Sequence, residues 1–162
     1  MAIRRLFLPE TAAVAESHGY VSRPWLSWCR DVMLQIGGEF LSPRFDAATF
    51  TATSGLWTLT DADVTSFANF RVGKLAFLTW DFTATTVSAT PASVSVDLPN
   101  GWSAARAAFT LCSGTDNGTV ATFVAQVASG GTALVFSRQD GANLSVAANA
   151  TAIRGQMFFE VQ

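Results

Sequence analysis

Apolar and polar residues alternate along most of the chain from residue 49 onward, and this period of two predicts β-strands. Turn signals such as VGK, DLPNG, TDNGT, SGGT and QDGAN interrupt the alternation at short intervals. No helical period of useful length occurs in this region. The pattern predicts nine strands, over Thr49–Ala52, Leu56–Leu59, Ser66–Arg71, Lys74–Ala84, Ser93–Asp97, Arg106–Leu111, Thr119–Val127, Thr132–Ser137 and Gln156–Val161.

The strand expected over 74–84 is apolar on both faces for most of its length. One face carries Leu75, Phe77 and Thr79 before it reaches Asp81, and the other carries Ala76, Leu78, Trp80 and Phe82 in alternation. Such a strand is buried on both sides, or it lies between a core and a subunit interface. Short strands without crossover helices predict a mainly β fold, namely an antiparallel β-sandwich of the jelly-roll kind.

A short α-helix is expected before the strands, in the stretch SRPWLSWCRDVMLQIGG. Ser22 is a suitable N-cap, Pro24 fits the first turn, and Gly37 and Gly38 end the helix. Residues 1–21 show no clear period and are interpreted as an extended arm. One apolar face of the helix is expected to anchor and trimerise the chain; it consists of Trp25, Trp28, Val32 and Ile36. We therefore expect an anchoring part over residues 1–45 and a β-sandwich over residues 46–162.

The composition adds a reason to expect self-association. Of the 162 residues, 49% are hydrophobic and only 14% are charged, whereas soluble chains average roughly 25% charged residues. No window approaches the roughly 18–20 apolar residues of a spanning helix, and the early run LFL ends at Pro9 and Glu10. We expect no membrane insertion and no signal peptide. A large subunit interface is the better explanation for the missing charge.

The charge balance argues against nucleic acid as a partner. The formal net charge is -2, the basic residues are scattered, and Arg4–Arg5 is the only adjacent basic pair. The two cysteines, Cys29 and Cys112, are too few for a disulfide framework and are interpreted as buried free thiols.

The sequence offers no recognisable catalytic constellation. The single histidine, His18, has no companion motif. Asp61 and Asp63 form the closest acid pair; a weak cation site there is conceivable, but loop aspartates bond nearby backbone amides far more often. Phosphate loops, nucleophile elbows and deaminase signatures are missing from the sequence. We interpret the chain as a non-enzyme without cofactor or metal.

Binding through aromatic residues is a second hypothesis. Trp57, Trp80, Trp102 and Tyr20 could stack on a sugar or on a partner side chain. In a sandwich, tryptophans are core residues more often than ligand platforms, which is the expectation for Trp57 and Trp80, and Trp102, in the loop LPNGW, is the best candidate for an exposed ring. Asp116 and Asn117 are interpreted first as residues of a hairpin turn, and in the binding hypothesis they are further loop residues that contact the ligand.

Two stretches resemble a family of small bacteriophage virion proteins. LPETAAVAESHGYVSRPWLSWCRDVMLQIGG is similar to an N-terminal pattern in which a Gly-x-x-Ser/Thr element, here Gly19 to Ser22, precedes paired tryptophans and a Gly-Gly stop. Cys29 departs from that pattern, where a bulky residue is commoner. LVFSRQDGANLSVAANATAIRGQMFFEVQ resembles the closing strands of phage fibre and appendage sandwiches.

The resemblance implies a homotrimeric structural protein of the virion, made in the host cytoplasm. It would be a head or tail fibre, or a fibre adaptor, attached to capsid, portal or tail proteins through its N-terminal arm. Two alternatives stay open: a module that binds host-surface carbohydrate through Trp102, Asp116 and Asn117, and a capsid cement (decoration) protein.

Overall fold

The computed structural model describes residues 23–25, 27 and 41–162, and the chain forms two compact units, residues 1–39 and residues 40–162. In the first unit, Arg23, Pro24, Trp25 and Ser27 are helical, as expected of the first turn of the predicted helix. Three members of the predicted anchoring face lie outside the described residues: Trp28, Val32 and Ile36. Among the residues described, no helix is long and apolar enough to cross a bilayer.

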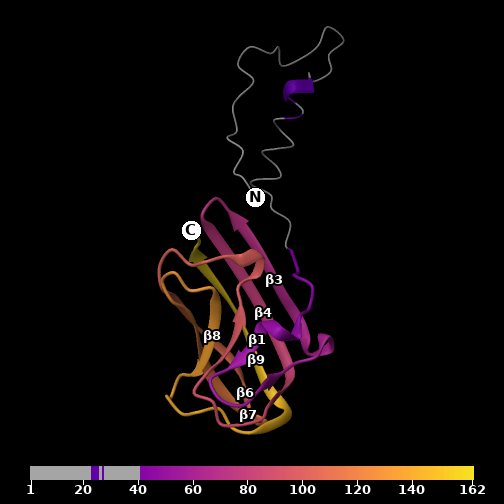
Figure 1. The fold of residues 1–162 in the computed structure, drawn as a ribbon, viewed down its shortest axis with the longest axis vertical. Helices are drawn as coiled ribbons and strands as arrows, with labels where there is room; N and C mark the ends of the chain where they lie inside the picture. The colour runs from indigo at the N-terminus through magenta and orange to yellow at the C-terminus, as the bar shows by residue number, and fades with distance from the viewer. Residues whose placement is uncertain (1–22, 26, 28–40) are drawn as a thin grey trace. The chain divides into compact units, whose positions relative to one another are not determined.

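The second unit is mainly β, as predicted, and the described residues contain nine strands (Figure 1). They are β1 (Phe50–Ala52), β2 (Trp57–Thr58), β3 (Val64–Val72), β4 (Leu75–Val87), β5 (Val94–Asp97), β6 (Ala108–Asp116), β7 (Thr119–Val127), β8 (Ala133–Arg138) and β9 (Ala147–Glu160). Each predicted strand corresponds to one of these.

Two strands extend well beyond their predicted bounds, whereas the others agree to within three residues at each end. β6 continues to Asp116 rather than ending at Leu111, and β9 begins at Ala147 rather than at Gln156. Both added stretches are rich in Ala, Ser, Thr, Gly and Asn, and Ile153 is their one large apolar residue, so they show no apolar alternation that marks a strand. Pairing with neighbouring strands, which is a tertiary effect, makes them β.

All strand pairs are antiparallel, and the strand order is β1-β5-β8-β7-β6-β9-β4-β2, with β3 also paired to β4. The two end strands, β1 and β2, are consecutive in the chain, and the rings of Phe50 and Trp57 are 5.4 Å apart. The sheet is therefore a nearly closed, barrel-like structure. The division into the two packed sheets of a jelly roll stays a prediction.

A bulged segment in β4 lets this strand pair with two different strands along the same edge, β3 and β2. Its register with β9 shifts on both sides of Thr85, and Ala84 takes a positive φ of 54°. The part of β4 before the bulge pairs with β3, and the part after it pairs with β2. The buried Thr85 hydroxyl accepts a hydrogen bond from Trp57 Nε1 at 2.9 Å and donates one to the Thr151 carbonyl at 3.0 Å.

The core consists of the inward residues of the sheet. The face of β4 that carries Ala76, Leu78, Trp80 and Phe82 is fully buried. Phe82 meets Phe50, Trp57 and Phe136 edge to face, with ring centroids 5.5 to 6.1 Å apart. The expectation that Trp57 and Trp80 are core residues is confirmed.

Candidate functional site

The loop tryptophan predicted to contact a ligand is only partly exposed. Trp102 follows the short 3-10 turn η3 (Pro99–Gly101), and its ring lies 6.4 Å from that of the buried Phe159. One part of the ring packs against the core, and the rest faces solvent.

Asp116 is buried and takes part in an ion pair. Its carboxylate accepts a hydrogen bond from Arg138 at 2.7 Å, and from the backbone N–H and hydroxyl of Ser145 at 3.0 to 3.1 Å. Asn117 is exposed and has a φ of 48° in the turn between β6 and β7. Trp102 precedes β6, and Asp116 is the last residue of this nine-residue strand. The structure therefore does not bring the three predicted contact residues together.

Arg138 joins Asp116 to the loop that follows β8. Its guanidinium also binds Asp140. The hydrogen bonds to Asp140 and Asp116 raise the pKa of Arg138, and the bond to Asp140 has the larger effect. Arg138 and the backbone N–H of Ala142 in turn hold the pKa of Asp140 below its usual range. This network fixes the loop around Gly141, and its polar groups are satisfied within the chain.

The remaining candidates for chemistry are accounted for by structure. Cys112 is a buried free thiol, as predicted, and burial raises its pKa to about 12, so it is not a thiolate nucleophile at neutral pH. Asp63 accepts hydrogen bonds from the backbone N–H and hydroxyl of Thr60, which caps the 3-10 turn η2 (Asp61–Asp63). Within the described part of the chain, no three His, Cys, Asp or Glu side chains are grouped as a metal site requires. His18 and Cys29 lie outside the described residues.

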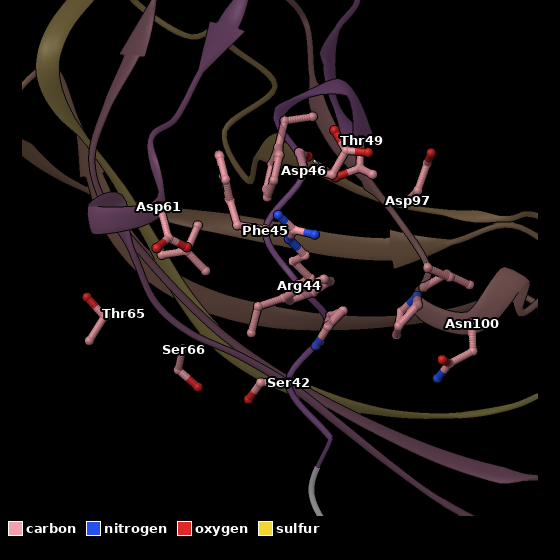
Figure 2. Close-up of a pocket in the computed structure, with 16 residues that line it drawn as sticks. Ser42, Arg44, Phe45, Asp46, Thr49, Asp61, Thr65, Ser66, Asp97 and Asn100 are labelled. Atoms are coloured by element: carbon pink, nitrogen blue, oxygen red, sulfur yellow. Dashed lines mark hydrogen bonds between the residues drawn. The ribbon is translucent and has the colours of Figure 1, made fainter.

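A cleft of about 430 Å³ lies where the sheet fails to close, between the start of β3 and the end of β5 (Figure 2). The segment before β1, residues 42–49, forms another wall of this cleft. The apolar part of the lining comes from Pro43, Phe45, Phe50, Val64, Phe67, Leu98 and Pro99. The polar part comes from Ser42, Arg44, Asp46, Thr49, Asp61, Thr65, Ser66, Asp97 and Asn100.

The walls of this cleft are held by hydrogen bonds. The backbones of Leu41 and Asn69 exchange two hydrogen bonds, of 2.8 and 2.9 Å, and the buried Asn69 side chain donates a third to the Leu41 carbonyl at 2.8 Å. Asn100 Nδ2 donates to Asn69 Oδ1 at 3.3 Å. Phe45 stacks on Phe50 with ring centroids 5.9 Å apart. These contacts fix the segment at residues 41–50 to β3, β1 and the turn after β5.

A second feature is an apolar surface on the outside of β3, β4, β9 and β6, which we call the outer apolar face. Leu75, Phe158 and Phe109 are 52%, 60% and 77% exposed, respectively. Strand register places Leu75 opposite Val72, and Phe158 opposite Phe77, whose ring is 4.6 Å away. The members of the outer apolar face are Val72, Leu75, Phe109, Leu111 and Phe158.

The border of the outer apolar face carries both signs of charge. Asp81 and Arg154 form an ion pair of 2.7 Å across β4 and β9, on the same side of the sheet as Phe158. A shallow hollow beside this pair is lined by residues of β6, β7 and β9, including Leu111, Gly155 and Gln156.

Sequence reasoning missed the cleft because its lining comes from separate segments, at residues 42–50, 61–67 and 97–100. No short motif encodes such an arrangement. The outer apolar face did leave a signal, namely the apolar second face of the strand expected over 74–84. Comparisons of the chain with protein-family models, curated proteins and solved structures find no match.

Proposed function

We propose that this protein is a homotrimeric structural component of a bacteriophage virion, a head or tail fibre or a fibre adaptor, in which copies pack through the outer apolar face. The exposure of Leu75, Phe109 and Phe158 on adjacent strands carries the proposal. Monomeric soluble proteins rarely leave such a contiguous apolar surface in water, and a patch with a polar border is typical of a protein interface.

Packing against further copies suits the chemistry of this surface. The Asp81–Arg154 pair neutralises both of its charges at the border of this surface, so no unpaired charge of this pair repels another copy. The low charge of the whole chain points the same way. The trimeric state and the virion location rest on the resemblance of the sequence to small phage virion proteins.

Two further parts belong to the same proposal. The helix face with Trp25, Trp28, Val32 and Ile36 adds a second contact between copies and anchors the arm to capsid, portal or tail. The β unit is a jelly-roll sandwich whose corner is the bulge at Ala84, because strands pass from one packed sheet to the other at bulges. A capsid cement protein would use the same surfaces at another place on the particle.

The solution mass of the full chain and of residues 40–162 tests where copies meet. A trimer in both cases supports an interface in the β unit. A truncated monomer would place assembly in the first unit instead. The truncation is made at residue 40 rather than 46, because Leu41 and Phe45 bond and pack within the second unit.

Immunolabelling of particles of the phage that encodes the chain tests the virion assignment. Labelled fibres, or labelled attachment points on head or tail, are expected. Particles that carry none of the protein would overturn the assignment.

A further inference from the structure

The cleft at the open side of the sheet has polar groups that the chain itself does not use. The side chains of Arg44, Asp61 and Asp97 make no hydrogen bond or ion pair with the described residues, although all three line the cleft. Figure 2 shows the Arg44 guanidinium in the middle of the cleft, with Asp61 on one side and Asn100 on the other. Up to five N–H donors and two carboxylates are therefore available to a ligand at one place.

The lining selects against two classes of ligand. Asp46, Asp61 and Asp97 place three carboxylates against the single guanidinium of Arg44, so an anion would meet net repulsion. A metal ion lacks a grouped set of ligands in the part of the chain described. A neutral molecule with many hydroxyl groups is not repelled by the carboxylates and does not need a grouped set of metal ligands.

The apolar part of the lining suits the other half of such a molecule. Phe45 and Phe67 are partly exposed beside the polar groups, and Val64 and Leu98 lie with them. A sugar ring has a C–H face that packs on apolar side chains and a rim of hydroxyls that both donate and accept hydrogen bonds. The cleft volume of about 430 Å³ lies within the range of small-molecule pockets, roughly 300–1,000 Å³.

The cleft is also preformed, which lowers the cost of binding. Asn69 and Asn100 tie the segment at residues 41–50 to the turn after β5, and Asp46 accepts a hydrogen bond from the Ala48 N–H at 2.9 Å, which holds the turn η1 (Ala47–Thr49). Little ordering of the walls is needed when a ligand enters.

We infer that this cleft binds a neutral saccharide. Its hydroxyl groups accept hydrogen bonds from Arg44 and donate to Asp61 and Asp97, while its C–H face packs on Phe45 and Phe67. This assignment is independent of the proposed assembly, and it places a saccharide site away from Trp102, Asp116 and Asn117.

Isothermal titration calorimetry of the full chain tests the inference. The probes are neutral disaccharides (maltose, lactose, cellobiose and chitobiose) and, as an anionic comparison, sialyllactose. At least one neutral disaccharide is expected to bind, with the amide signals at residues 42–50, 61–67 and 97–100 shifting in NMR spectra of the unmodified chain. Shifts confined to other residues would overturn the inference.

Variants locate the site independently. Arg44→Gln and Asp61→Asn should each raise Kd about tenfold or more, as expected when a hydrogen bond to a charged group is lost. Both residues are exposed, so the variants should fold, which circular dichroism checks. Arg106→Gln is the matched control, because that arginine is exposed and pairs with Glu160 at 3.5 Å, outside the cleft lining; its Kd should stay within about twofold.

The opposing outcomes are equally specific. Binding that survives Arg44→Gln and Asp61→Asn but is lost in Trp102→Ala would place the site at the loop tryptophan and overturn the inference. Binding of sialyllactose alone, or of no probe, would overturn it as well. Because the readout is affinity rather than mass, failure here is distinguishable from failure of the proposed assembly.

Discussion

β4 and β9 each turn one face to the core and one face outward, and both faces carry large apolar side chains. On β4 the inward Leu78, Trp80 and Phe82 are fully buried, while the outward Leu75, three to seven positions away, is about half exposed. On β9 the same contrast separates the buried Phe159 from its neighbour Phe158. The two faces are similar in chemistry, so the difference is that folding of the described residues buries only the inward one.

This comparison gives a physical meaning to the low charge of the sequence. An apolar face that folding does not bury remains a source of free energy for association, at about 25 cal/mol per Å² of area removed from water. The inner face stabilises the monomer, and we propose that the outer face stabilises the assembly. Substitutions on the two faces should therefore have different consequences.

The largest effect is expected on the inner face. Phe82→Ala leaves a cavity beside Phe50, Trp57 and Phe136 and should lower the free energy of unfolding by about 3–5 kcal/mol. Chemical denaturation followed by fluorescence measures this loss. Phe158→Ala, an aromatic truncation on the outer face of β9, should cost far less in a dilute monomer. Equal losses for both variants would contradict the contrast between the faces.

A smaller loss is expected where a buried polar group holds the end of the sheet. Asp116→Ala leaves the Ser145 backbone N–H without its acceptor, which should cost about 1–3 kcal/mol. Thermal unfolding followed by circular dichroism measures it, with the exposed Gln126→Ala on β7 as a surface control. A variant as stable as the control would show that the Asp116 network does not support this end of the sheet.

A gain in stability is expected at the bulge of β4. Ala84 holds a left-handed backbone conformation that disfavours residues with a Cβ atom, so Ala84→Gly should stabilise the chain by up to about 1 kcal/mol. The midpoint of denaturation reports the change. Destabilisation instead would mean that the entropy lost by glycine outweighs the relief of strain.

The smallest effect concerns Cys112, on the inner side of β6, and it changes the stability only above about pH 9. Burial raises the pKa of Cys112 to about 12 from an ordinary value of 9.0, so the folded state binds this proton more tightly than the unfolded state does. The stabilisation is complete below about pH 9 and is lost as the pH rises toward 12. Unfolding measured across this window should show a decline that is weaker in Cys112→Ser. Identical slopes in both chains would contradict the assigned burial.

The alternation of apolar and polar residues predicted the mainly β fold and every strand of the second unit, because strand periodicity is local. It did not predict the beginning of β9, where mostly small residues become β through pairing with β4 and β6. It also indicated that the strand containing Leu75 is largely apolar on both of its faces. The cleft could not be predicted, since Arg44, Asp61 and Asp97 are far apart in the sequence and line one cleft only in the folded chain. Likewise, the Asp116 turn was recognisable from the sequence, but its partner Arg138 was not.

The outer apolar face is tested most directly by the mass of the full chain in solution, measured by size-exclusion chromatography with light scattering. The unmodified chain should have the mass of a trimer, and the double variant Leu75→Ser/Phe158→Ser should have a smaller mass with an unchanged circular dichroism spectrum. Val120→Ser, which changes a residue that is 86% exposed on β7, should behave as the unmodified chain does. An unmodified chain that stays monomeric, or a double variant with the mass of the trimer, would contradict an assembly built on this face.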